Sequence, residues 1–217
     1  MTTKRQLAKE LENLSKFKQL DIKKEQYTTP GDIASQILWE AFMLGDIEYK
    51  KILDLGCGNG ILGIGALLLG AKEVIFIDID KEALDVCKHN VIELNNDLDQ
   101  NYNVLSKCEF IISDVNDLDI NKIKNYKINT VIMNPPFGTK IKHVDKEFLK
   151  KAIEIVKNGG TIYSFHKSST LRFVDTFCKD NNKKVTHKFD FKYPLYSSYK
   201  FHEKPKKFID VSVVRIK

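Results

Sequence analysis

Residues 51–60 read KILDLGCGNG, an apolar run that leads directly into glycines at positions 56, 58 and 60. Glycine lets a backbone turn tightly and come close to a ligand. A helix that begins behind such a turn points its amide-rich N-terminus at the same ligand. The stretch therefore predicts a buried strand, a ligand-binding loop and a helix. Gly58, Gly60 and Gly63 also fit the GxGxxG spacing of a dinucleotide-binding fold, so the glycines alone leave a nicotinamide enzyme open.

Apolar runs and helical patterns alternate along the rest of the chain. We expect strands at 51–55, 73–78, 108–113, 129–134, 160–166, 184–191 and 208–216. We expect helices at 4–20, 32–44, 61–69, 81–95, 145–157 and 170–181, with a polar loop at 114–127. This alternation is typical of right-handed crossovers and of a mostly parallel sheet covered on both faces. We therefore expect one α/β domain over 1–217, with an N-terminal helical part at 1–49 and a Rossmann-like core at 50–217.

Composition argues against membrane, secreted and metal-binding classes. The longest apolar stretches are shorter than the roughly 20 residues that a membrane span requires. Residues 1–14, MTTKRQLAKELENL, lack the apolar core of a signal peptide. The cysteines at 57, 87, 108 and 178 form no CxxC pair and have no histidine at metal-ligand spacing. We therefore expect no metal site and no disulfide framework. We also expect the protein in the cytoplasm or nucleus, and of these two compartments we predict the cytoplasm.

Positive charge is concentrated in the C-terminal third of the chain. Residues 1–139 contain 16 Lys and Arg against 21 Asp and Glu, a net charge of −5, whereas residues 140–217 contain 19 against 8, a net charge of +11. A basic face would attract a phosphate backbone and release counterions on binding it. A lysine-rich, evenly solvated surface explains the charge equally well.

Three acidic residues stand at predicted strand ends. Asp54 precedes the first glycine, Asp78 follows Gly58 by 20 residues, and Asp114 follows the third strand. A carboxylate in the place of Asp78 can accept hydrogen bonds from both ribose hydroxyls of a nucleotide cofactor. Because aspartate also caps helices and forms turns, a purely structural role is the alternative for each of them.

The fourth predicted strand is followed by Asn134, Pro135, Pro136 and Phe137. Two prolines fix the backbone and remove two amide donors, which leaves carbonyl oxygens free to accept hydrogen bonds. The side-chain oxygen of Asn134 and the Pro135 carbonyl can hold both hydrogens of a planar amino group, and Phe137 can stack on its ring. That arrangement orients the nitrogen and supports the positive charge that develops as it attacks a methyl group. An ordinary Asn-Pro turn is the alternative.

The D-x-G-x-G-x-G arrangement, with acids after the next two strands, resembles the class I methyltransferases, which use S-adenosylmethionine. This resemblance implies a seven-stranded Rossmann-like sheet. It assigns the methionine part of the cofactor to Asp54, Gly56, Cys57, Gly58 and Gly60, the ribose to Asp78, and the adenine to Asp114 and Val115. Ile79 and Asn134 complete the predicted cofactor site. The Asn-Pro-Pro-Phe segment resembles that of enzymes that methylate adenine N6, guanine N2 or protein glutamine.

A closer resemblance covers nearly the whole chain. The segments EQYTTP, DLGCGNGILGIGA, FIDID, VIMNPPFGT, HKSST and SYKFHEK occur in this order. Together they are similar to the methyltransferase-like family that makes N6-methyladenosine in small-subunit ribosomal RNA of eukaryotes and archaea. The resemblance implies that Gln26, Tyr27 and Thr29 close over the cofactor and that residues 134–137 hold the adenine. Nothing is carried over onto residues 95–109, which look longer and more polar than the family pattern.

Two segments are predicted to contact RNA. His166, Lys167 and Ser168 can bind phosphate or a flipped nucleotide, although Ser168 or Ser169 can equally cap a helix. Residues 192–207 interleave aromatic and basic side chains as single-strand binding sites do. There we assign RNA contacts to Lys200, Phe201, His202 and Lys204, and we expect some of the aromatic residues to belong to the core. A base must leave its stack to reach a pocket, so an unpaired adenosine is the natural substrate.

A protein partner is also predicted. In the usual class I strand order the strand at 108–113 lies at the sheet edge, where exposed backbone groups allow another chain to pair. The resembled family uses a small zinc-binding activator of the Trm112 type, and we expect that activator at this edge.

Other functions stay open. A protein glutamine methyltransferase shares the cofactor site but usually has Tyr in place of Phe137, and the basic C-terminal third disfavours it. Guanine N2 and DNA adenine N6 are further amino acceptors. A non-catalytic RNA-binding subunit would have no need of intact glycines, acids and residues 134–137. A nicotinamide oxidoreductase leaves residues 134–137 unexplained.

Overall fold

The computed structural model describes residues 3–15, 28–97, 103–137, 144–195 and 207–217. The strands are β1 (Lys51–Leu55), β2 (Glu73–Asp78), β3 (Cys108–Ile112), β4 (Thr130–Met133), β5 (Thr161–Lys167), β6 (Val185–Leu195) and β7 (Lys207–Ile216). The α-helices are α1 (Lys4–Asn13), α2 (Gly31–Met43), α3 (Ile61–Leu68), α4 (Lys81–Asp97), α5 (Ile120–Lys124), α6 (Val144–Ile155) and α7 (Leu171–Asp180). Two short 3-10 helices are η2 (Leu105–Lys107) and η3 (Ser168–Thr170).

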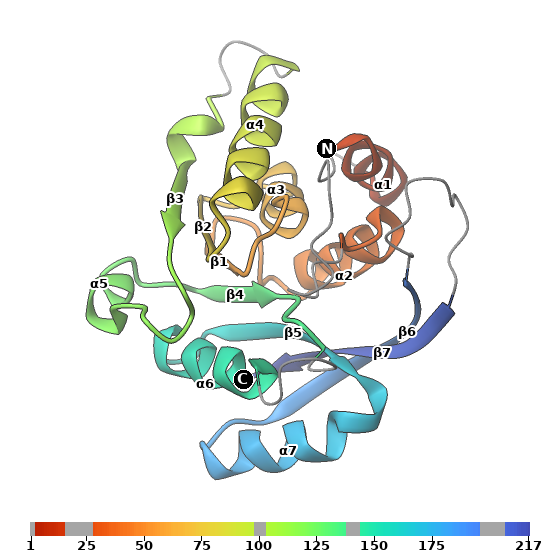
Figure 1. Ribbon diagram of the computed structural model, residues 1–217, viewed down its shortest axis with the longest axis vertical. Coiled ribbons are helices and arrows are strands. Elements are labelled where there is room, and N and C mark those ends of the chain that lie inside the picture. Colours follow the sequence, from red (N-terminus) through yellow and green to blue (C-terminus); the bar gives the residue numbers. More distant parts are fainter. Residues whose placement is uncertain (1–2, 16–27, 98–102, 138–143, 196–206) are drawn as a thin grey trace.

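All seven strands form one sheet, in the order β3-β2-β1-β4-β5-β7-β6. The strands from β3 to β5 are parallel, and β7 runs antiparallel to both of its neighbours, β5 and β6. Figure 1 shows helices on both faces of this sheet. The predicted mostly parallel α/β sheet of seven strands is therefore confirmed. A helix long and apolar enough to span a bilayer is not found among the described residues.

Two expectations about local structure were wrong. The helix expected over 4–20 ends at Asn13, because Leu14 adopts an extended backbone with ψ of 140°; residues 16–20 lie outside the described part of the chain. The polar loop expected over 114–127 contains α5. The side chain of Asp119 caps that helix by accepting hydrogen bonds from the backbone N–H groups of Asn121 and Lys122. A helix of one turn is too short to show an apolar periodicity.

Side chains of the parallel strands alternate between two apolar cores, as the two-residue period of a strand requires. Ile52, Val74 and Ile132 belong to the core formed with α1, α2, α3 and α4. Their neighbours Leu53 and Ile75 belong to the core formed with α5, α6 and α7. Figure 1 shows the two groups of helices on opposite faces. Because both faces are buried, the strands read as continuous apolar runs rather than as alternating ones.

Two glycines let α3 lie close against its neighbours. A Cβ atom on Gly63 would lie 2.3 Å from the Phe76 ring of β2, and one on Gly65 would lie 2.3 Å from a Leu38 methyl group of α2. A larger side chain would therefore push α3 away from β2 at position 63 and away from α2 at position 65. This close packing places the N-terminus of α3 directly behind the carboxyl end of β1.

A buried ion pair joins the N-terminal part of the chain to the sheet. Asp46, just after α2, accepts hydrogen bonds from Arg215 Nε at 2.7 Å and from the hydroxyls of Tyr163 at 2.7 Å and Thr161 at 3.0 Å. The Thr130 hydroxyl donates to the Asp46 main-chain oxygen at 2.6 Å. Burial by itself raises the pKa of Asp46, but the hydrogen bonds and the Arg215 charge outweigh it and hold the pKa below its ordinary value. The carboxylate thus fixes α2 against β4, β5 and β7.

Replacing Arg215 with Met should destabilise the protein by about 3 kcal/mol or more, because it leaves the Asp46 carboxylate buried without its cation. The matched control is Lys179→Met, which removes an exposed ion pair with Asp175 and should cost less than about 1 kcal/mol. Urea unfolding of both variants measures the difference. Equal midpoints for the two variants would show that the Asp46 cluster does not stabilise the fold.

Candidate active site

The carboxyl ends of the parallel strands bring the predicted functional residues together. β1 lies between β2 and β4, with Asp54 opposite Phe76 on one side and Ile132 on the other. Asp78 closes β2, and Asn134 directly follows β4. In an open α/β sheet this edge is where ligands bind. The fold therefore places the glycine loop, the acids and residues 134–137 along one edge.

The glycine loop is held in a conformation that other residues rarely adopt. Gly56, Gly58 and Gly60 have φ of 72°, 55° and 84°, in the left-handed region that favours glycine. The N–H groups of Gly56 and Cys57 both donate to the Ile77 carbonyl, at 2.8 and 2.9 Å. A Cβ atom on Gly60 would lie 2.4 Å from the Cys87 sulfur of α4. The loop is therefore tied to the end of β2 and packed closely against α4.

Asp54 is buried beneath this loop. Its Oδ2 accepts the Gly63 N–H at 2.8 Å, whereas its Oδ1 is buried and has no hydrogen-bond partner in the described part of the chain. Burial raises the pKa of Asp54 to about 7, against the effect of the Gly63 hydrogen bond, and the negative charge of Asp78 adds to the rise. One oxygen of the carboxyl group thus binds the N-terminal turn of α3 through the Gly63 N–H. The other is able to accept a hydrogen bond or to contact a positive charge.

Asp78 joins the loop to the turn after β2. Its Oδ2 accepts the Gly58 N–H at 2.8 Å and its Oδ1 accepts the Asp80 N–H at 2.9 Å. Burial raises the pKa of this carboxyl despite the hydrogen bonds from the Asp80, Gly58 and Ile79 N–H groups. The next side chain, Ile79, is 59% exposed although it is apolar. A nucleoside has an apolar base face and polar ribose hydroxyls. An exposed isoleucine beside a carboxylate that backbone N–H groups hold in place matches these two parts.

Asp114 and Val115 follow β3, as expected. One Asp114 oxygen accepts from the Asn116 backbone N–H at 2.7 Å and from the Asn116 side chain at 3.1 Å. Val115 is buried in the core with α5 and α6. Asp114 therefore forms the turn that sequence reasoning gave as its alternative role, and a ligand contact from it stays a prediction.

Asn134 has a side chain held in one orientation. Its Nδ2 donates to the Thr29 hydroxyl at 3.0 Å and to the Tyr193 hydroxyl at 3.1 Å. Its Oδ1 is buried and has no partner among the described residues. Because the amide has only two hydrogens, both are already used within the protein. What remains is a single acceptor oxygen, as the predicted recognition of an amino group requires.

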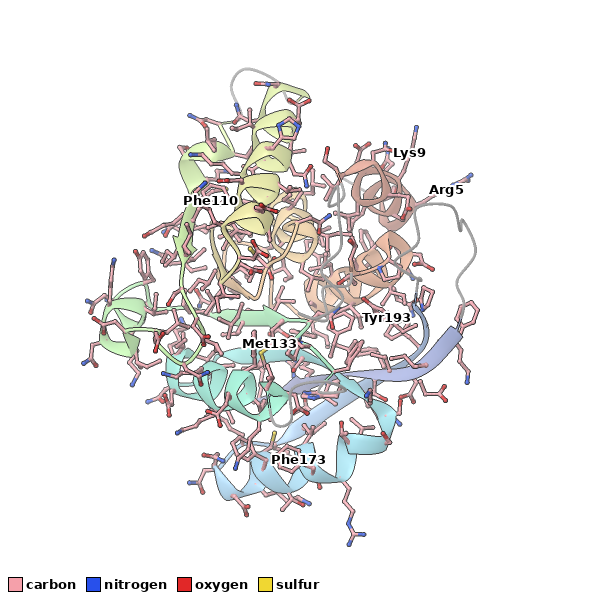
Figure 2. The ribbon with its side chains drawn as sticks, in the orientation of Figure 1. Arg5, Lys9, Phe110, Met133, Phe173 and Tyr193 are labelled. Carbon is pink, nitrogen blue, oxygen red and sulfur yellow. The ribbon has the colours of Figure 1, made fainter. Side chains whose placement is uncertain are left out.

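Tyr193 is a residue of this site to which sequence reasoning assigned no role there. It lies in β6 and is fully buried, on the face of the sheet that α2 covers (Figure 2). Its ring meets the Phe137 ring edge-on, with centroids 5.6 Å apart. In sequence it is one aromatic residue in a segment predicted to contact RNA, 59 residues from Asn134. The strand order β4-β5-β7-β6 brings Tyr193 and Asn134 together.

The segment at the end of β5 and the start of η3 differs in part from the expectation. His166 is 2% exposed, and burial lowers its pKa to about 4, so at neutral pH it carries no charge for a phosphate. Its Nε2 lies 2.8 Å from the Ser164 hydroxyl. Ser168 does not cap α7 but bonds to the Ser212 hydroxyl at 2.8 Å. Of the two basic residues predicted for RNA contact in this segment, Lys167 is partly exposed, and its contact with RNA stays a prediction.

Several predicted contacts lie outside the described residues: Gln26, Tyr27, Lys200, Phe201, His202 and Lys204. Thr29 of the same N-terminal motif is described, and it bonds to Asn134. Within the described ranges no group of three or more His, Cys, Asp or Glu side chains is arranged to hold a metal ion.

Comparison with known proteins agrees with this geometry. The methyltransferase small domain family matches residues 28–186. The rRNA N(6)-adenosine-methyltransferase METTL5 of Danio rerio is 36% identical over 207 residues, 94% of this chain and 94% of the relative. The Drosophila melanogaster protein of the same name is 33% identical over 97% of this chain and 94% of its own length.

A solved structure agrees as well. A Pyrococcus horikoshii protein, provisionally described as an RNA methyltransferase, has 40% identity and a TM-score of 0.84, over 100% of this chain and 98% of that one. The chain therefore belongs to the methyltransferase small domain family and, within it, to the group that includes the rRNA N(6)-adenosine-methyltransferases of the METTL5 type.

Proposed function

We propose that this methyltransferase transfers a methyl group from S-adenosylmethionine to the N6 amino group of an adenosine in small-subunit ribosomal RNA. The observation that carries the proposal is the buried Oδ1 of Asn134, which has no hydrogen-bond partner within the described ranges. A buried acceptor without a donor costs about 1–3 kcal/mol, a cost that the N–H of a bound amine removes. The METTL5 relatives, named as rRNA N(6)-adenosine-methyltransferases, support adenosine as the acceptor.

The residues at the strand ends fit S-adenosylmethionine. Asp54 Oδ1, for which the described part of the chain offers no donor, lies beneath the glycine loop, where a cationic methionine group would neutralise its charge. Asp78 and the exposed Ile79 would hold the adenosine part of the cofactor. Asp114 and Val115 would contact its adenine base. We also propose that Gln26, Tyr27 and Thr29 close over the cofactor. When bound, the cofactor supplies a methyl group on a sulfonium ion, activated for in-line displacement.

The protein's own part is to orient the acceptor nitrogen. In our proposal the Asn134 oxygen and the Pro135 carbonyl each accept one hydrogen of the amino group. This arrangement turns the nitrogen toward the methyl donor and supports the positive charge that it gains. Pro136 holds the backbone in place, and Phe137 provides an aromatic surface for the base. The extra proton on the methylated nitrogen is strongly acidic and passes to water.

A protein glutamine is the second candidate, because its side-chain amide also presents two hydrogens to an acceptor pair. Lys167 at the end of β5 and the basic stretch at 200–204 favour RNA over that substrate, and we propose RNA contacts from Lys167, Ser168, Lys200, Phe201, His202 and Lys204. His166 can contribute only as a neutral group.

A protein that methylates ribosomal RNA is expected in the cytoplasm or the nucleus. We propose the cytoplasm, and cell fractionation tests this proposal.

Asn134→Ala should lower methyl transfer at least about 100-fold, the cost of losing one well-placed hydrogen-bonding group in an active site. The assay uses labelled S-adenosylmethionine, small-subunit and large-subunit ribosomal RNA, and digestion to nucleosides. Asn121→Ala, an exposed asparagine of α5, is the matched control and should retain full activity. N6-methyladenosine from the large subunit alone would overturn the subunit assignment, and label in another nucleoside would overturn the acceptor.

Cofactor binding should depend on pH through Asp54. Since the pKa of Asp54 is raised to about 7 and only the carboxylate attracts a cation, S-adenosylmethionine should bind about ten-fold more weakly at pH 6 than at pH 8. Asp54→Asn keeps an acceptor for Gly63 and should bind weakly at both pH values. Calorimetric titration measures both affinities. The same pH dependence in the wild type and the variant would exclude Asp54 as its cause.

We also propose that β3 pairs with a Trm112-type zinc-binding activator. β3 is an end strand of the sheet, and Ile112 is 54% exposed on it. Phe110, labelled in Figure 2, stacks on Phe76 of β2 with centroids 5.2 Å apart, which stiffens this edge. Co-elution of the two purified proteins in size exclusion, lost in Ile112→Asp, is the expected result. Separate elution of the wild-type proteins at micromolar concentration would argue against this partner.

A further inference from the structure

The Tyr193 hydroxyl is one of two groups that hold the Asn134 amide. It accepts from Nδ2 at 3.1 Å, and the Thr29 hydroxyl accepts from the same atom at 3.0 Å. Tyr193 lies in β6, Thr29 just before α2, and Asn134 after β4. Three segments far apart in the sequence therefore meet at a single side-chain nitrogen.

The direction of these bonds matters more than their strength. An asparagine amide that turns by half a revolution exchanges its oxygen and its nitrogen at nearly the same positions. Turned that way, Asn134 would present donors to an amino group, which also donates, and recognition would fail. A hydroxyl both accepts and donates, so its own hydrogen must be engaged elsewhere if it is to favour one orientation. The Tyr193 hydroxyl also donates to the Thr28 main-chain oxygen, over a long distance of 3.5 Å.

Tyr193 also contacts the far end of the same segment. Its ring meets Phe137 edge-on, while its hydroxyl meets Asn134. The ring is fully buried in the core that includes α2 residues and Phe137, so it has little freedom to move. One rigid side chain thus sets the position of both the hydrogen-bond acceptor and the aromatic surface proposed for the base.

We propose that Tyr193 is a positioning residue for methyl transfer, which fixes the Asn134 amide with Oδ1 directed at the acceptor amine. The role rests on the proposed function, since it has meaning only if an amino group is methylated. Thr29 shares the task. Thr29 should therefore affect the catalytic step, in addition to the contact with the cofactor that we propose for residues 26–29.

The test compares Tyr193→Phe with Tyr163→Phe. Both tyrosines are fully buried, and each variant loses one hydroxyl. The Tyr163 hydroxyl, however, donates to Asp46 at the other end of the sheet. Tyr193→Phe should lower kcat about ten-fold, equal to about 1.4 kcal/mol, with KM for RNA and the Kd for S-adenosylmethionine within two-fold of wild type. Tyr163→Phe should lower the unfolding midpoint and leave kcat per folded molecule unchanged.

Thr29 provides a second, independent arm. Thr29→Ser keeps the hydroxyl and should retain kcat, whereas Thr29→Val removes the hydroxyl and should lower kcat. Combining Thr29→Val with Tyr193→Phe should lower kcat further. An active wild type whose kcat survives Tyr193→Phe, or falls equally in the two tyrosine variants, would overturn the positioning role alone. A wild type that labels no amino group would overturn the proposed function, and this role with it.

Discussion

Both hydrogens of the Asn134 amide are used inside the protein, and the chemistry that we propose for the site follows from this constraint. Thr29 and Tyr193 accept them, so the side chain can offer only an acceptor to whatever binds beside it. An acceptor selects for amino donors and rejects carbonyl groups, which would leave the oxygen unpaired. The parallel order of β2, β1 and β4 then places the glycine loop and its acids along the same edge.

Stability and function draw on separate parts of the same sheet. Asp46, Arg215 and Tyr163 form a fully hydrogen-bonded buried cluster that secures α2. At the carboxyl ends of the parallel strands, by contrast, Asp54 and Asn134 each keep one buried oxygen that has no partner among the residues the structure describes. Native proteins tolerate few such groups, and those they keep often serve a ligand. These two acceptors are therefore the atoms to which we assign donors from the cofactor and the substrate.

Much of the fold and of the candidate site could be predicted from the sequence, because short local patterns of residues determine these parts. Residues 51–60 indicated a strand, a tight loop and a helix, and the structure has all three. Residues 134–137 indicated an acceptor site at a strand end. The one-turn helix α5 left no such pattern. Tyr193 could not be assigned, because its contact with Asn134 depends on the place of β6 in the sheet, where it pairs antiparallel with β7. His166 looked like a surface ligand, and only the packing of the sheet shows that it is buried and neutral.

Nuclear magnetic resonance of the ¹⁵Nδ2 group of Asn134 can show whether the side chain is held in the orientation described above. The signals can be assigned by their loss in Asn134→Asp. Two amide protons that are both held by hydroxyl acceptors should exchange slowly with water and shift when Tyr193 is changed to Phe. Fast-exchanging protons that do not respond to Tyr193→Phe would mean that the amide is free to turn, and would contradict the account.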